Sequence, residues 1–181
     1  MTMKLVMLLA AIVALLAPVA ALADATPTPA STANALCKAA QTSMGATLFG
    51  QTYGTNADRS NAFGKCVAKN ASNAQHAVTN AAESCKAQQA DPNFAASHGG
   101  KTFEQFYGSN SSKGKGAAAN AYGKCVSQTV SNAVKAQSAA LTNAAKTCKA
   151  SLKADAAAFA AKYGTGRNAL GKCVSATAKT K

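Results

Sequence analysis

The chain has 181 residues and a formal net charge of +13 at pH 7, because 19 residues are Lys or Arg and only 6 are Asp or Glu. It has 2 histidines, scattered carboxylates and no G-x-S-x-G, phosphate-loop or H-E-x-x-H motif, so the recurring groups of hydrolytic or metal-dependent catalysis are missing. We therefore expect a non-enzymatic protein without a cofactor or metal.

The first 23 residues have the pattern of a cleaved signal peptide. Lys4 provides a positive start, residues 5–16 are apolar, and residues 21–23 read Ala-Leu-Ala, which fits a small-x-small cleavage site. A membrane-spanning helix would need about 20 apolar residues, and Pro18 interrupts this region. We expect a secreted or envelope protein with a Thr/Pro/Ala linker at 24–33, one domain at 34–175 and a basic tail at 176–181.

Three copies of one pattern fill residues 34–175. Each copy has a Cys-Lys pair, then Phe-x-x-x-Tyr-Gly, then a seven-residue motif, Asn-Ala-x-Gly-Lys-Cys-Val, at 61–67, 120–126 or 168–174. The third residue of that motif is always large and apolar. All six cysteines lie in these motifs: Cys37 and Cys66, Cys85 and Cys125, Cys148 and Cys173. Such regular recurrence indicates an architecture of three imperfect repeats.

The apolar periodicity predicts helices throughout. Apolar residues recur every three or four positions from Phe63 to Cys85 and from Tyr122 to Leu152, which predicts two long helices. Ser60 or Asn61 can cap the first one, and Asp91-Pro92 should end it. Surface loops are expected at 55–60, 109–119 and 165–167, where the copies differ in length.

Each copy should also contain a short helix whose aromatic residues pack between the long ones. Its Phe and Tyr are four residues apart and share a helix face, and a Gly follows them at the expected helix end. The residues expected to pack at the three junctions are Phe49, Tyr53 and Phe63; Phe103, Tyr107 and Tyr122; Phe159, Tyr163 and Leu170.

The glycine inside the seven-residue motif, at positions 64, 123 and 171, needs a separate explanation. Glycine costs about 1 kcal/mol relative to alanine inside a helix. We therefore expect another backbone or an aromatic ring to approach the helix closely at these positions.

The helices restrict the disulfide pairing. On one helix Cys66 and Cys85 would lie about 28 Å apart, far beyond the about 7 Å between bridged α-carbons, and the same holds for Cys125 and Cys148. Pairing within each copy is the simplest of the fifteen possible connectivities. It requires a bend before each aromatic helix, for which Gly45, Pro92 with Gly99-Gly100, and less clearly Asp155 are available. The predicted fold is all-α, a bundle or short solenoid with the disulfides Cys37–Cys66, Cys85–Cys125 and Cys148–Cys173.

The repeat resembles small secreted bacterial proteins that carry repeated F-x3-Y-G and N-A-F-G-K-C-V motifs, and the resemblance covers nearly all of residues 34–175. It implies export and a helical repeat, but no particular activity.

The lysines beside the cysteines are the main candidates for function. They are Lys38 and Lys65, Lys86 and Lys124, Lys149 and Lys172. Disulfides within the copies would make three basic spots, suited to an anionic polysaccharide or cell-envelope polymer. The alternative is a solvated helix face that only keeps the protein soluble. Nucleic acid is a weaker candidate, because the chain has two arginines and no Trp. The two histidines, His76 and His98, are expected to be solvent-exposed. The predicted function is a secreted structural or binding protein; the alternative is a secreted effector or toxin-like protein acting on other cells.

Overall fold

The computed structural model describes residues 26–108 and 120–179, and every regular element in these two ranges is an α-helix. The expected signal peptide, the start of the linker, the loop at 109–119 and the last two residues lie outside the described residues. The helices are α1 (Pro29–Met44), α2 (Ala46–Tyr53), α3 (Ala62–Ala90), α4 (Phe94–Ser97), α5 (Phe103–Tyr107), α6 (Ala121–Ala154), α7 (Ala156–Tyr163) and α8 (Ala169–Lys179).

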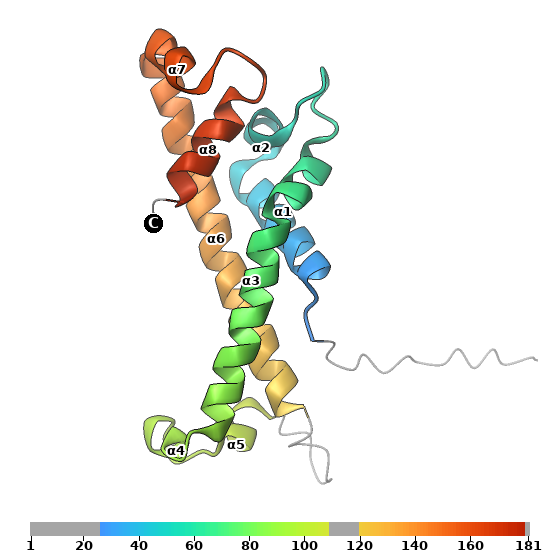
Figure 1. Ribbon diagram of the computed structural model, residues 1–181, viewed down its shortest axis with the longest axis vertical. Helices are drawn as coiled ribbons and strands as arrows, with labels where there is room; N and C mark the ends of the chain where they lie inside the picture. The colour runs from blue at the N-terminus through green and yellow to red at the C-terminus, as the bar shows by residue number, and fades with distance from the viewer. Residues whose placement is uncertain (1–25, 109–119, 180–181) are drawn as a thin grey trace, which may run out of the picture.

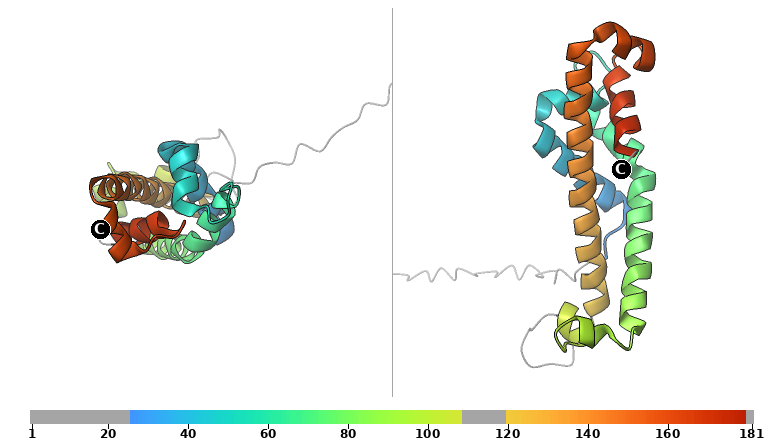
Figure 2. Two further views of the ribbon diagram at one scale, coloured as in Figure 1. Left: turned by 90° about the horizontal axis from the view of Figure 1, so that it is seen from above. Right: turned by 90° about the vertical axis from the view of Figure 1, so that its left-hand side faces the viewer.

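Two long helices, α3 and α6, form the axis of the molecule and lie side by side in opposite directions (Figure 1). The shorter helices α1 and α8 pack along one half of this pair. The right-hand view of Figure 2 shows α4 and α5 at the opposite end of the bundle, beyond the end of α3. The result is an elongated all-α bundle, which confirms the predicted fold class.

The three predicted disulfides are present, and each joins two consecutive longer helices. Cys37–Cys66 links α1 to α3, Cys85–Cys125 links α3 to α6, and Cys148–Cys173 links α6 to α8, each with α-carbons 5.9 Å apart. The first and third lie in one core cluster and the second lies in another. We call the two ends the α2/α7 end (residues 45–70 and 141–178) and the α4/α5 end (residues 81–108 and 120–130).

The bends that this pairing requires occur at the expected residues. Gly45 separates α1 from α2 with φ of +77°, a conformation that side chains disfavour. Asp91-Pro92 ends α3, and Gly99 and Gly100 also have positive φ. Asp155 leaves the helical conformation between α6 and α7, and its Oδ1 accepts a hydrogen bond from the Ala158 N–H (2.8 Å).

Two expectations about helix starts were wrong. The segment 24–33 is not linker throughout, because α1 begins at Pro29: Thr28 and Ser31 cap each other's backbone, and Ala33 is buried. Asn61 occupies the cap position of α3 but makes no side-chain cap. Its amide instead pairs with Thr55, accepting from the backbone N–H (3.0 Å) and donating to the hydroxyl (2.8 Å). The expected basic tail also begins within α8, which extends to Lys179.

The large side chains expected at the three junctions pack in or against the two core clusters. Phe49, Tyr53, Phe103, Phe159 and Leu170 are buried, whereas Phe63, Tyr107, Tyr122 and Tyr163 are half-buried against the clusters.

Two apolar residues differ from the sequence pattern. Phe94, which no motif singles out, is buried beside Phe103, with ring centroids 5.5 Å apart. Leu152, which the periodicity places on the buried face of α6, is 39% exposed.

Candidate functional site

The structure distributes the six candidate lysines unequally between the two ends. Lys86 and Lys124 lie at the α4/α5 end, and Lys65, Lys149 and Lys172 lie at the α2/α7 end; Lys38, on α1, lies outside both ranges but is next to Cys37 of the same cluster as these three. Lys124 is half-buried and the other five are exposed. The lysines therefore form one larger and one smaller group, whereas the sequence suggested three similar spots along the molecule.

The remaining charges increase this difference. Among the described residues of the α4/α5 end, three lysines (86, 101 and 124) are matched by three acids (83, 91 and 104). At the α2/α7 end, nine cationic residues (59, 65, 69, 146, 149, 153, 162, 167 and 172) face two acids (58 and 155). Both acids have local roles, because Asp155 caps α7 and Asp58 accepts from the Ser60 N–H (3.1 Å). That hydrogen bond is the main reason that the pKa of Asp58 lies below its usual value.

Three lysines of the α2/α7 end line one pocket of about 390 Å³, which we call the lysine pocket. Lys65 and Lys172 occupy the same position of the seven-residue motif in the first and third copies, and Lys69 lies one turn after Lys65 on α3. The other lining residues are mostly polar and come from α2, the loop after it, α3, the loop before α8 and α8 itself: Thr52, Tyr53, Thr55, Ala68, Asn168 and Gly171.

A close contact between α2 and α8 creates the lysine pocket. Gly171 lies so near Thr52 that a Cβ added there would overlap the Thr52 carbonyl oxygen. Lys69 secures the same region by donating a hydrogen bond from Nζ to the Gly171 carbonyl (3.0 Å). The expectation of close approach thus holds at Gly171, but it is wrong at Gly64, where an added Cβ would meet nothing within 4 Å.

The two arginines of the chain meet at the same end. Arg59 has a left-handed backbone, with φ of +61°, and its Nη1 donates to the carbonyls of Gly54 (2.6 Å) and Arg167 (3.1 Å). Its side-chain stem lies over Gly54, where an added Cβ would be 2.7 Å from the Arg59 Cβ. Arg59 therefore ties the loop before α3 to the loop before α8, which positions the cations of the first and third copies together.

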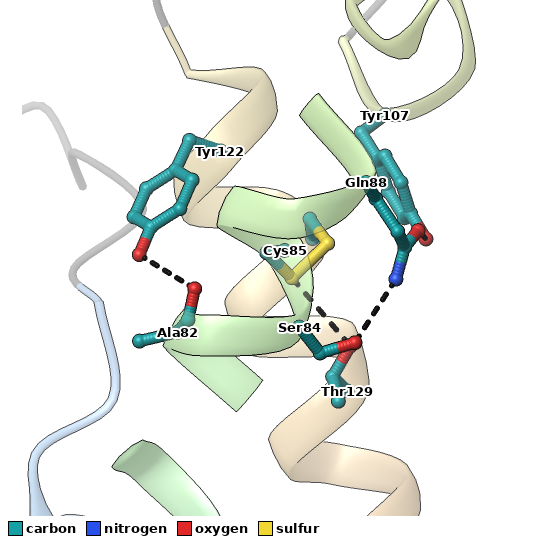
Figure 3. Close-up of a disulfide and its surroundings, with 8 residues drawn as sticks. Ala82, Ser84, Cys85, Gln88, Tyr107, Tyr122 and Thr129 are labelled. Atoms are coloured by element: carbon teal, nitrogen blue, oxygen red, sulfur yellow. Dashed lines mark hydrogen bonds between the residues drawn. A yellow bond between two sulfur atoms is a disulfide. The ribbon is translucent and has the colours of Figure 1, made fainter. Parts of the chain in front are cut away.

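Hydrogen bonds between uncharged groups surround the disulfide at the α4/α5 end (Figure 3). Tyr122 donates to the Ala82 carbonyl (3.1 Å), Tyr107 donates to the Gln88 side chain (2.9 Å), and the Thr129 hydroxyl lies 3.8 Å from the Cys85 sulfur. These contacts join α3, α5 and α6 around the disulfide and serve the packing of this end.

The two histidines lie in different surroundings. His76 is exposed on α3, as expected. His98 is not solvent-exposed as expected, because its ring stacks on Phe94 at 3.7 Å and its Nδ1 lies 2.8 Å from the Phe94 carbonyl. All six cysteines are in disulfides, and the described residues contain no cluster of three or more metal-ligating side chains. None of the helices in the described ranges is both long and apolar enough to cross a membrane.

Comparison with known protein families, curated proteins and solved structures gives no significant match. The resemblance to small secreted bacterial proteins therefore stays a prediction, and arguments about function rest on the arrangement of this chain's own residues.

Proposed function

We propose that the protein is an exported, non-enzymatic binding protein whose α2/α7 end engages an acidic polysaccharide of the cell envelope. The unequal distribution of charge carries the proposal, because nine cationic residues and two acids share that end. A surface with one predominant sign of charge attracts a polymer of the opposite sign. The three disulfides fit an oxidising, extracellular compartment.

The lysine pocket supplies the centre of this surface. Lys65 and Lys172 are exposed on its rim, and the neighbouring Thr55 and Asn168, which are also exposed, can donate hydrogen bonds to carboxylate or sulfate oxygens. A lysine near an anionic surface contributes about 1 kcal/mol at physiological salt. Loss of both rim lysines should therefore cost about 2 kcal/mol, or about 30-fold in affinity.

The test compares two variants with the same loss of charge. Lys65→Gln with Lys172→Gln removes two charges from the lysine pocket, and Lys86→Gln with Lys124→Gln removes two from the α4/α5 end. Binding of the oxidised protein to an acidic polysaccharide, to purified cell envelopes and to DNA is measured over a salt series.

We expect binding to polysaccharide and envelopes that weakens with salt, falls about 30-fold in the first variant and changes little in the second. Equal losses in the two variants would contradict the assignment to the α2/α7 end. Tighter binding to DNA than to the polysaccharide would contradict an envelope partner. Absence of binding at low salt would leave the lysines a role in solubility only.

A further inference from the structure

A second depression at the α2/α7 end has a different chemical character, and we call it the α7 groove. Its volume is about 680 Å³, within the range of about 300–1,000 Å³ that is usual for small-molecule sites. The last turns of α6 and the helix α7 form one wall, and the loop at 164–167 with the start of α8 forms the other. Gln51 and Arg59 close one side.

The floor of the α7 groove is apolar. Phe159 and Leu170 are buried there, with 5% and 7% of their surface exposed. Leu152 lies beside them but is 39% exposed, one of two large apolar side chains that are exposed in the described ranges. Leu152 is thus the large apolar side chain of the groove that the protein's own helices leave uncovered.

The rim of the α7 groove is cationic. Lys149 and Lys153 lie on α6, one turn apart, and Arg167 and Arg59 lie on the two loops opposite. No acidic residue lines the groove. The nearest acid along the chain, Asp155, caps α7 through Oδ1 and keeps its charge, but the four cations outnumber it, so the local field favours an anion.

We propose that the α7 groove binds a single-chain amphiphile with an anionic head, such as a fatty acid. The acyl chain covers Leu152, Phe159 and Leu170, and the head lies among Lys149, Lys153 and Arg167. An apolar floor with a few charged groups at its edge is the usual composition of such a site. A purely polar polymer would leave the exposed Leu152 uncovered, and a neutral lipid would leave the cations without a counter-charge. This site is separate from the lysine pocket and does not depend on polysaccharide binding.

Calorimetric titration with laurate below its critical micelle concentration tests the proposal. Dodecyl maltoside supplies the same chain with a neutral head, and acetate and inorganic phosphate supply an anionic head without a chain. We expect one laurate per protein, binding at least tenfold weaker for the maltoside, and no measurable binding of the two small anions. Equal binding of maltoside and laurate would overturn the role of the cations, and laurate binding only above the micelle concentration would overturn a monomer site.

Matched variants locate the site. Leu152→Gln should weaken laurate about three- to sevenfold, because the 39% of Leu152 that is exposed is what the acyl chain can cover. A substitution at this exposed position should leave the fold intact. Lys149→Gln with Lys153→Gln should weaken laurate by a similar factor. The controls at the α4/α5 end are Phe106→Gln, the other exposed large apolar residue, and Lys86→Gln with Lys124→Gln.

The controls should bind laurate as the unaltered protein does, with far-UV circular dichroism showing that the helices are intact. Unchanged laurate affinity in both groove variants would refute the site. The variant Lys65→Gln should keep laurate binding, since it leaves unchanged Lys172, whose Nζ lies near Gly164 of the groove, and Leu152→Gln should keep polysaccharide binding. The two proposals can therefore fail separately.

Discussion

Replacing Gly64 or Gly171 by alanine is the same substitution at the same position of the seven-residue motif, yet the structure predicts opposite effects on stability. Gly64 lies in the first turn of α3, is exposed, and has no atom within 4 Å of an added Cβ. Gly64→Ala should therefore raise the free energy of unfolding by about 0.5–1 kcal/mol, through the smaller entropy of the unfolded alanine chain. For a chain of this size the midpoint of thermal unfolding should rise by about 1–4 °C.

Gly171→Ala meets the backbone of α2. The added Cβ would overlap the Thr52 carbonyl oxygen, and a backbone atom cannot rotate aside as a side chain can. Overpacking of this kind costs about 1–3 kcal/mol. Subtracting the gain in helix propensity leaves a loss of about 1–2 kcal/mol, or about 2–8 °C in the midpoint. Displacement of α8 would also lengthen the hydrogen bond from Lys69 Nζ to the Gly171 carbonyl.

Thermal unfolding of the two oxidised variants, followed by far-UV circular dichroism, checks the pair directly. Each variant controls the other, because the chemical change is identical and only the surroundings differ. A stabilised Gly171→Ala protein would show that α8 does not approach α2 as described. A destabilised Gly64→Ala protein would show that an uncharacterised contact covers the start of α3.

Three further substitutions test other parts of the structure. Cys85→Ala with Cys125→Ala opens a link across 40 residues of chain and should cost about 4 kcal/mol in the chain-entropy model; hydrogen exchange should accelerate first at the α4/α5 end, and uniform acceleration would contradict two separate clusters. Burial raises the pKa of Tyr53 to about 12, although the nearby Asn70 side chain acts to lower it. Because the unfolded tyrosine loses its proton near pH 10, stability should fall between about pH 10 and 12 by up to about 2.7 kcal/mol; urea unfolding over this range should show a smaller fall for Tyr53→Phe, and an unchanged fall would assign it to another group. Asp155→Ala removes the cap of α7 and should cost about 1 kcal/mol, measured by urea unfolding; a loss below about 0.3 kcal/mol would show that packing alone holds the bend.

Local signals in the sequence predicted the two long helices and the bends, and they made the observed disulfide pairing the simplest one; α4 and the start of α1 were not predicted. The ends of α3 and α6 depend on residues beside them, such as Asp91 and Asp155, and the helix lengths then leave few partners for each cysteine. The early start of α1 had a local signal too, because Thr28 and Ser31 are spaced as a reciprocal cap around a proline at the first helical position. Composition alone suggested linker there, and the cap spacing is the better guide.

The candidate sites could not be predicted from the sequence, because they depend on which distant segments meet. Lys69 belongs to no motif and enters the lysine pocket only because α8 crosses α2 beside it. Leu152 fits the apolar period of α6, but periodicity assigns a residue to a helix face and does not show whether a neighbour covers it. The gathering of charge at the α2/α7 end likewise arises from folding, since its nine cations come from both halves of the chain.

Each of the long helices α3 and α6 carries cysteines of two successive disulfide junctions. Whether the number of junctions is odd or even therefore decides how they are divided between the two ends of the bundle. Each long helix carries the chain from one end of the bundle to the other, so odd-numbered junctions fall at one end and even-numbered junctions at the other. With three junctions, two are stacked at one end and one stands alone. An even number would place equally many junctions at each end. The difference between the two ends of this molecule therefore follows from its odd number of junctions.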